Sequence, residues 1–135
     1  MRGRPRRQLP VDGRELAAIS AGGALGALGR AGLAQALPHA AGAWPWATLA
    51  VNLLGALVLG WTVARVSQES YGRPFLGIGV CGTLTTFATL QLELLQMLDA
   101  GRWALALAYA AVSLTGGLAA VRLGLRLAGS ERVRA

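Results

Sequence analysis

The segment of this sequence with the clearest chemistry is the polar run at residues 79–87. It reads Gly-Val-Cys-Gly-Thr-Leu-Thr-Thr-Phe and lies inside a stretch that is otherwise apolar enough to cross a membrane. Hydrocarbon offers no hydrogen-bond partners, so a helix broken at membrane depth is tolerated only where protein buries it or where it lines a watery path. Carbonyl and N–H groups freed at such breaks bind ions in transporters. The run therefore indicates transport of something small.

Polar side chains also interrupt the other apolar stretches. Arg30 lies in the first stretch, Asn52 in the second, Glu93 after the polar run, and Tyr109 and Ser113 lie one turn apart in the fourth. Ionisable groups inside membranes are costly and are functional by default. Structural alternatives remain for each: a pinning or snorkelling side chain for Arg30, a hydrogen bond between helices for Asn52, and a water-facing helix end for Glu93. Tyr109 and Ser113 could be ordinary packing residues. These residues are candidates for an ion path.

The composition predicts the elements that position these residues. Of 135 residues, 54% are hydrophobic and 14% charged, whereas about 25% of residues are charged in soluble domains. A span needs about 20 residues to cross the hydrocarbon layer. We expect an all-α integral membrane protein. It forms a single domain, 1–135, with spans near residues 15–37, 44–65, 74–98 and 102–127.

Arginine accounts for all of the basic residues and is unevenly placed. The net charge is +7, and most arginines lie at the ends and in short connections, as the positive-inside rule requires, rather than in a nucleic-acid-binding pattern. Four spans place both termini and the middle loop on one side. That side holds Arg2, Arg4, Arg6, Arg7, Arg14, Arg65, Arg73, Arg122, Arg126, Arg132 and Arg134. The sequence thus predicts one orientation, with the N- and C-termini in the cytoplasm.

The sequence contains no pattern of an enzyme. The single cysteine, Cys81, excludes an internal disulfide and a multi-cysteine metal site. The glycine run that begins at Gly22 lies inside an apolar stretch with no strand before it, so it is not a dinucleotide fingerprint. Small residues at helical spacing in several spans are more simply explained by close packing of helices in lipid.

Four runs, one in each span, resemble the CrcB/Fluc family of fluoride channels. They are Gly-Ala-Leu-Gly-Arg at 26–30, Thr-Leu-Ala-Val-Asn-Leu-Leu-Gly at 48–55, the polar run at 79–87, and a Tyr-x-x-x-Ser-x-x-x-Gly-Leu pattern at 109–118. The resemblance covers all four spans in order. It implies a passive, fluoride-selective channel that exports cytoplasmic fluoride and so reduces its toxicity.

The resemblance also implies roles for particular residues. Asn52 would donate its amide to fluoride, and Phe87 would offer the electropositive edge of its ring. Thr48, Tyr109 and Ser113 would line the pore. Arg30 would lie at a vestibule and Glu93 near the ion path.

The assembly implied by the resemblance is a dimer of two antiparallel subunits with two pores. A structural sodium ion would lie at the dimer centre, held by the backbone carbonyls of Gly82 and Thr85, because hard cations favour oxygen ligands. The dimer could pair the chain with itself or with an oppositely oriented homologue. The arginine bias favours the homologue.

This chain departs from the family pattern at Leu90, where a second phenylalanine is usual. Leucine has no polarised ring edge, so the pore built on this third span is expected to be impaired. One alternative is therefore a channel-like partner subunit of a heterodimer. Another is a small antiparallel drug exporter, which is disfavoured because the first span carries Arg30 and no embedded carboxylate.

Overall fold

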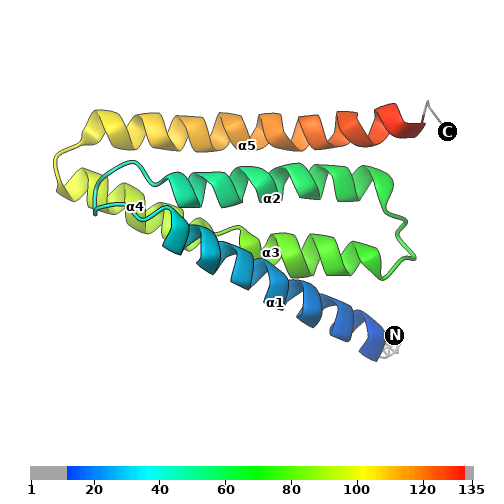
Figure 1. The fold of residues 1–135 in the computed structure, drawn as a ribbon. Helices are drawn as coiled ribbons and strands as arrows, with labels where there is room; N and C mark the ends of the chain where they lie inside the picture. The colour runs from blue at the N-terminus through cyan, green and yellow to red at the C-terminus, as the bar shows by residue number, and fades with distance from the viewer. Residues whose placement is uncertain (1–11, 133–135) are drawn as a thin grey trace, which may run out of the picture.

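The computed structural model describes residues 12–132, which form a sheaf of antiparallel helices (Figure 1). The elements are α1 (Gly13–Ala36), α2 (Trp46–Arg65), the π-helical segment η1 (Pro74–Cys81), α3 (Gly82–Leu84), α4 (Phe87–Asp99) and α5 (Trp103–Arg132). Four candidate membrane spans result, because η1, α3 and α4 together make the third. The expected all-helical protein with four spans and a broken third span is confirmed.

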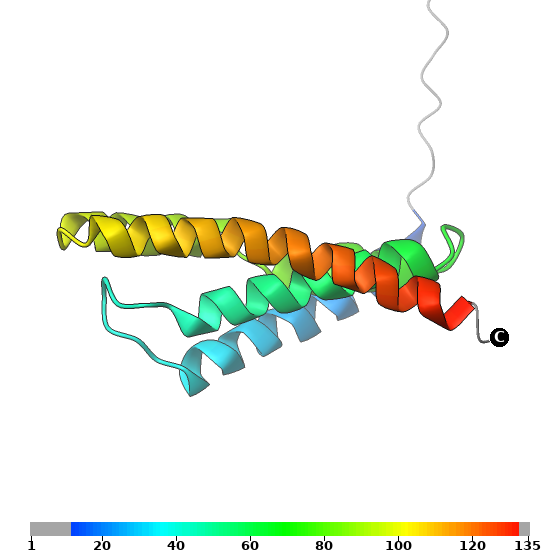
Figure 2. The same cartoon turned by 90° about the horizontal axis from the view of Figure 1, so that it is seen from above.

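The order of the helices places both ends of the described chain and the loop 66–73 at one end of the sheaf (Figures 1 and 2). Arg14, Arg65 and Arg73 lie at or near that end, and Arg102 follows the turn at the other. Arg2, Arg4, Arg6, Arg7 and Arg134 lie outside the described residues. The last helix, α5, continues through Arg132.

Local signals explain where the helices begin. Asp12 caps α1 by accepting a hydrogen bond from the Arg14 backbone N–H at 2.9 Å, and it also accepts one from the Tyr71 hydroxyl at 2.7 Å. Together these hydrogen bonds, led by that of Tyr71, hold the pKa of the Asp12 carboxyl below its usual value. This contact therefore contributes stability above the ordinary pKa of aspartate, and the contribution is lost as the pH falls through the lowered value.

Glycines allow α1 to lie directly against the first part of the third span. A Cβ added at Gly22 would overlap the carbonyl oxygen of Phe75, and one added at Gly26 would overlap the carbonyl oxygen of Val80. Small residues permit this backbone approach in lipid, where no hydrophobic force draws helices together. The packing explanation for these glycines is confirmed.

Glycines also allow α2 to pack closely against α5, and these two helices have the most extensive contact in the described structure. A Cβ at Gly60 would overlap the carbonyl oxygen of Val121, and one at Gly124 would overlap that of Leu57. These two contacts hold α2 and α5 close together at the end of the molecule that carries the termini. The other half of the molecule is packed instead by a buried cluster in which Leu49, Met97 and Tyr109 surround Ala106.

We expect Gly22→Ala to lower the melting temperature of the purified protein. The methyl group meets backbone atoms, which cannot rotate away, and overpacking of this kind destabilises proteins by about 1–3 kcal/mol. Gly32→Ala, in the same helix, is the control, since a Cβ at Gly32 has no atom within 4 Å. Equal melting temperatures for the two variants would contradict the close approach of α1 to η1.

The helix break is shorter than the sequence indicated. The run 79–87 was expected to be broken by its glycines, but helical backbone continues through Leu84 and only Thr85 and Thr86 leave it. The glycine at position 79 serves packing instead, because a Cβ there would lie 2.7 Å from the Ile19 carbonyl oxygen of α1. The backbone before the break is π-helical, a form that is frequent at functional sites.

Candidate functional site

The side chain of Asn52 holds the break in the third span. The backbone is extended at Thr86, with φ −148° and ψ 116°, so this residue cannot use helical hydrogen bonds. Its N–H donates to Asn52 Oδ1 at 2.8 Å, and its carbonyl oxygen accepts from Asn52 Nδ2 at 3.2 Å. One amide thus satisfies both polar groups of the broken backbone, which hydrocarbon would leave unpaired.

The helix restarts directly after the break. The Thr86 hydroxyl oxygen accepts a hydrogen bond from the Thr89 N–H at 3.2 Å, which caps the N-terminus of α4. The positive end of the α4 dipole therefore lies beside the break, where it favours an anion. Phe87 is the first residue of α4, and 73% of its surface is exposed.

A groove runs from the break along α4 and α5. It brings together four of the residues predicted for the pore, Asn52, Phe87, Leu90 and Ser113, and Gln91, Leu94, Ala110 and Leu114 complete its lining. The Asn52 amide has two N–H groups, of which Thr86 uses one. The Ser113 hydroxyl is buried and has no hydrogen-bond partner among the described residues. The groove therefore offers an unused amide N–H group, the side chain of Ser113 and an aromatic ring.

Two other predicted pore residues meet at Glu93 instead of lining this groove. The Thr48 hydroxyl donates to Glu93 Oε1, and the Tyr109 hydroxyl donates to Oε2 at 2.7 Å. Glu93 is 5% exposed and Tyr109 is fully buried. His39 Nε2 lies 3.7 Å from Glu93 Oε1. A buried carboxylate with two hydroxyl donors and an adjacent imidazole is thus built into this half of the molecule.

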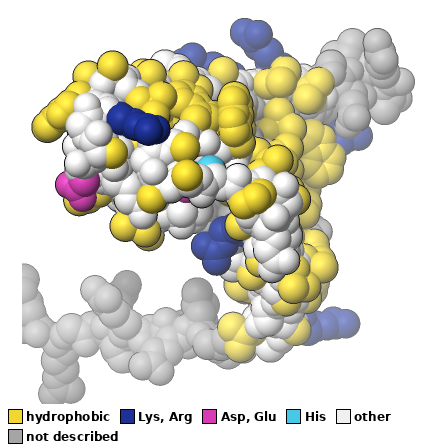
Figure 3. All heavy atoms as spheres, turned by 60° about the vertical axis from the view of Figure 1, so that its left-hand side comes forward, with side chains coloured by type: hydrophobic (Ala, Val, Ile, Leu, Met, Phe, Trp, Pro, Cys, Tyr) yellow, Lys and Arg dark blue, Asp and Glu magenta, His cyan; other side chains and the backbone are white. Residues whose placement is uncertain are grey.

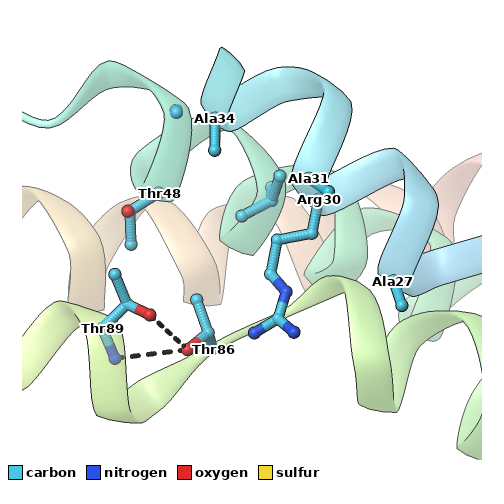
Figure 4. A pocket seen from close by; sticks show the side chains of 9 residues that line it. Ala27, Arg30, Ala31, Ala34, Thr48, Thr86 and Thr89 are labelled. Carbon is cyan, nitrogen blue, oxygen red and sulfur yellow. Dashed lines mark hydrogen bonds between the residues drawn. The ribbon is translucent and has the colours of Figure 1, made fainter. Parts of the chain in front are cut away.

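Arg30 lies in a separate pocket on the other side of the break (Figure 4). Its side chain extends from α1 towards Thr86, and the pocket is lined by the hydroxyl-bearing residues Thr48, Thr86 and Thr89. The remaining walls are small or apolar, formed by Ala27, Ala31, Ala34, Ala47 and Val51. A guanidinium among hydroxyl groups suits an anion. The break therefore has a cationic pocket on one side and the pore groove on the other.

The two carbonyls predicted to hold sodium have lost their helical donors at the break. In a continuous helix the Thr86 N–H would bond the Gly82 carbonyl and the Thr89 N–H would bond the Thr85 carbonyl. Here those N–H groups bond Asn52 Oδ1 and the Thr86 hydroxyl. Gly82 is also exposed. Two free carbonyl oxygens at an exposed break fit a hard cation, which needs further oxygen ligands from elsewhere.

The sequence did not reveal the roles of His39 and Thr86. No sequence pattern predicted a partner for His39, but the loop between α1 and α2 places its imidazole beside Glu93. No local pattern connects these residues, which are far apart in the sequence. Thr86 acts through its backbone N–H and carbonyl groups. The sequence marks this residue only by its place between two helical segments.

Comparison with known proteins places these features in a family. The model of the family described as CrcB-like protein, Camphor Resistance (CrcB), matches residues 17–125. The chain is 51% identical over 128 residues to Fluoride-specific ion channel FluC 1 of Mycobacterium bovis, covering 91% of this chain and 96% of that protein. It is 44% identical over 117 residues to Fluoride-specific ion channel FluC of Thermus thermophilus, covering 83% and 93%.

Proposed function

This chain belongs to the CrcB family of fluoride-specific ion channels, and on that premise we propose that fluoride crosses the membrane along the groove lined by Asn52, Phe87 and Ser113. The protein is a multi-pass protein of the cell membrane that transports fluoride, and it is not an enzyme. That membership removes the drug-exporter alternative. What remains to be assigned is the path and the assembly.

The observation that carries the proposed path is the unused amide hydrogen of Asn52 at a break in a membrane span. Fluoride is small and strongly hydrated, so a pore must replace its water with well-placed donors. Asn52 is fixed by Thr86 and does not need to reorganise when the ion arrives. The Ser113 hydroxyl supplies a second donor, and the ring edge of Phe87 supplies positive electrostatic potential.

The groove also supports a second subunit. Polar groups such as Asn52 and Ser113 line an open groove at membrane depth, and lipid cannot satisfy them. A second, antiparallel subunit would close the groove into a pore. It would also bring another pair of Gly82 and Thr85 carbonyls to the break, giving a structural sodium ion oxygen ligands from both subunits.

We assign the second subunit to an oppositely oriented homologue in preference to another copy of this chain. The arginines concentrated at the end with the termini favour one orientation, with both termini cytoplasmic. An antiparallel pair needs one subunit in each orientation. Leu90 lines the groove without a ring edge, so one pore of such a pair would be weakened while the other is intact.

Fluoride efflux from liposomes tests this function. We expect no efflux from this protein alone and efflux when it is reconstituted with an oppositely biased homologue, with chloride as the control ion. Conduction by this protein alone would show that it forms an antiparallel pair with itself. Absence of fluoride efflux in both preparations would contradict the channel function.

Replacing Leu90 with phenylalanine is expected to increase fluoride efflux several-fold in the conducting preparation. The substitution restores a polarised ring edge in the groove, and such edges contribute about 0.5–1.5 kcal/mol to aromatic contacts. Leu94→Phe, in the same groove one turn further along α4, is the control and should not increase efflux. Equal efflux from the wild type and Leu90→Phe would show that Leu90 does not limit conduction.

A further inference from the structure

His39 is positioned to control the hydroxyl groups around Glu93. It lies in the loop between α1 and α2, at the end of the molecule remote from the termini, with its side chain 25% exposed. Figure 3, which views this end, shows the imidazole in cyan among hydrophobic side chains. The imidazole therefore contacts water on one side and the buried carboxylate on the other. It is the only histidine in the sequence.

The hydroxyl groups of Thr48 and Tyr109 each have a single hydrogen to donate. Both hydrogens go to Glu93, Thr48 to Oε1 and Tyr109 to Oε2. While these bonds persist, neither hydroxyl can donate to an anion. Thr48 also lines the pocket that contains Arg30, so its hydrogen would be useful there if it were released.

His39 and Thr48 share the same carboxylate oxygen. The His39 Nε2 atom lies 3.7 Å from Oε1, just beyond a hydrogen bond, while the Thr48 hydroxyl is bonded to it. A protonated imidazole is a charged donor and forms a stronger hydrogen bond to a carboxylate than a neutral hydroxyl does. Protonation of His39 would draw Oε1 towards the imidazole and weaken the bond from the Thr48 hydroxyl, because the two donors would then share one acceptor oxygen.

We propose that His39 is a positioning residue that makes fluoride conduction increase with acidity at this end of the channel. The inference rests on the proposed function. When protonated, His39 pairs with Glu93, weakens the bond from the Thr48 hydroxyl, which lines the anion pocket, and offsets the negative charge of the buried Glu93 side chain. Each of these changes favours an anion. When neutral, His39 leaves Thr48 bonded to Glu93 and the carboxylate charge uncompensated.

The other charged groups around this end are two arginines and an aspartate. Histidine is the side chain that ordinarily titrates between about pH 5 and 8. From α5, Arg102 donates through Nη1 to the Gly42 carbonyl at 3.2 Å, beside the His39 loop. From α1, Arg30 lies in the adjoining pocket, and Asp99 is exposed at the end of α4. A pH dependence of fluoride conduction in this range would therefore arise at the His39–Glu93 pair.

The test compares wild-type, His39→Gln and His39→Arg proteins, each reconstituted with the same oppositely biased homologue, in fluoride efflux from liposomes buffered equally on both sides at pH 5.5 or 7.5. Efflux from protein-free liposomes is subtracted, because neutral hydrogen fluoride crosses bilayers unaided. We expect wild-type efflux to be at least about threefold greater at the lower pH, since charge at a pore mouth changes ion capture by such factors. His39→Gln should be slow and His39→Arg fast, both independently of pH.

Each outcome decides one claim. A pH dependence retained in His39→Gln would overturn the inference while leaving the fluoride channel intact. Wild-type efflux that does not change with pH would do the same. Absence of wild-type fluoride efflux at both values would instead contradict the proposed function, on which the inference rests. A merely structural role for His39 is distinguished by His39→Arg, which would then be as slow as His39→Gln.

Discussion

Replacing Asn52 with leucine is expected to abolish fluoride efflux through the pore that Asn52 lines, lowering the total efflux of the conducting preparation, and to destabilise the subunit. The Thr86 N–H and carbonyl would both lose their partner at membrane depth, and a buried unsatisfied polar group costs about 1–3 kcal/mol. The pore would also lose its fixed amide donor. Removal of one preorganised donor from a water-excluded site typically costs about 100-fold in rate. Efflux and melting temperature should therefore fall together.

Two further variants separate these effects. Asn52→Asp retains an acceptor for the Thr86 N–H but places a carboxylate where an anion must pass. In this variant the loss of fluoride efflux should therefore be greater than the loss of stability. Thr62→Val is the control on the same helix, because the buried Thr62 hydroxyl bonds only the Val58 carbonyl of its own turn, at 2.7 Å. Fluoride efflux at the wild-type rate from Asn52→Leu would remove Asn52 from the ion path.

Replacing Phe87 with alanine is expected to reduce fluoride efflux without destabilising the subunit. With 73% of its surface exposed, the ring contributes little to packing within the chain, and exposed substitutions usually change stability by less than about 0.5 kcal/mol. The ring lines the groove with Asn52 and Ser113. Loss of up to about 1.5 kcal/mol of ion stabilisation corresponds to about a tenfold loss of efflux.

The control for Phe87 is Leu92→Ala. Leu92 lies on the same helix with 57% of its surface exposed, and it is not part of the groove. This variant should match the wild type in both efflux and melting temperature. A Phe87→Ala protein that melts earlier and conducts normally would reverse the assignment and make the ring a structural contact.

Much of the fold follows from simple sequence signals. Four apolar stretches of sufficient length predict four spans, and polar residues near 85 predict a break in the third. Asn52 stood out because an amide is costly in an apolar span. The resemblance then grouped Asn52, Phe87, Leu90 and Ser113, which the structure places in one groove.

The remaining features depend on contacts between distant segments. Gly79 looks like a helix breaker in the sequence, but its role is set by the α1 backbone that passes over it. The extent of the break is set by the Asn52 amide, whose reach matches a single residue, Thr86. The partner of His39 depends on how the loop before α2 folds back. Such pairings are not encoded in local periodicity.

The bond between Asn52 and Thr86 also imposes an order on biogenesis. Synthesis proceeds from the N-terminus, so α2 is already in the bilayer when the third span emerges. The Asn52 amide is then in place to bond the Thr86 backbone as soon as the break enters the membrane. A circularly permuted chain that inserted the third span before α2 would have to place two unpaired backbone groups in lipid. Chain order thus spares the nascent protein an intermediate that a quality-control protease would recognise.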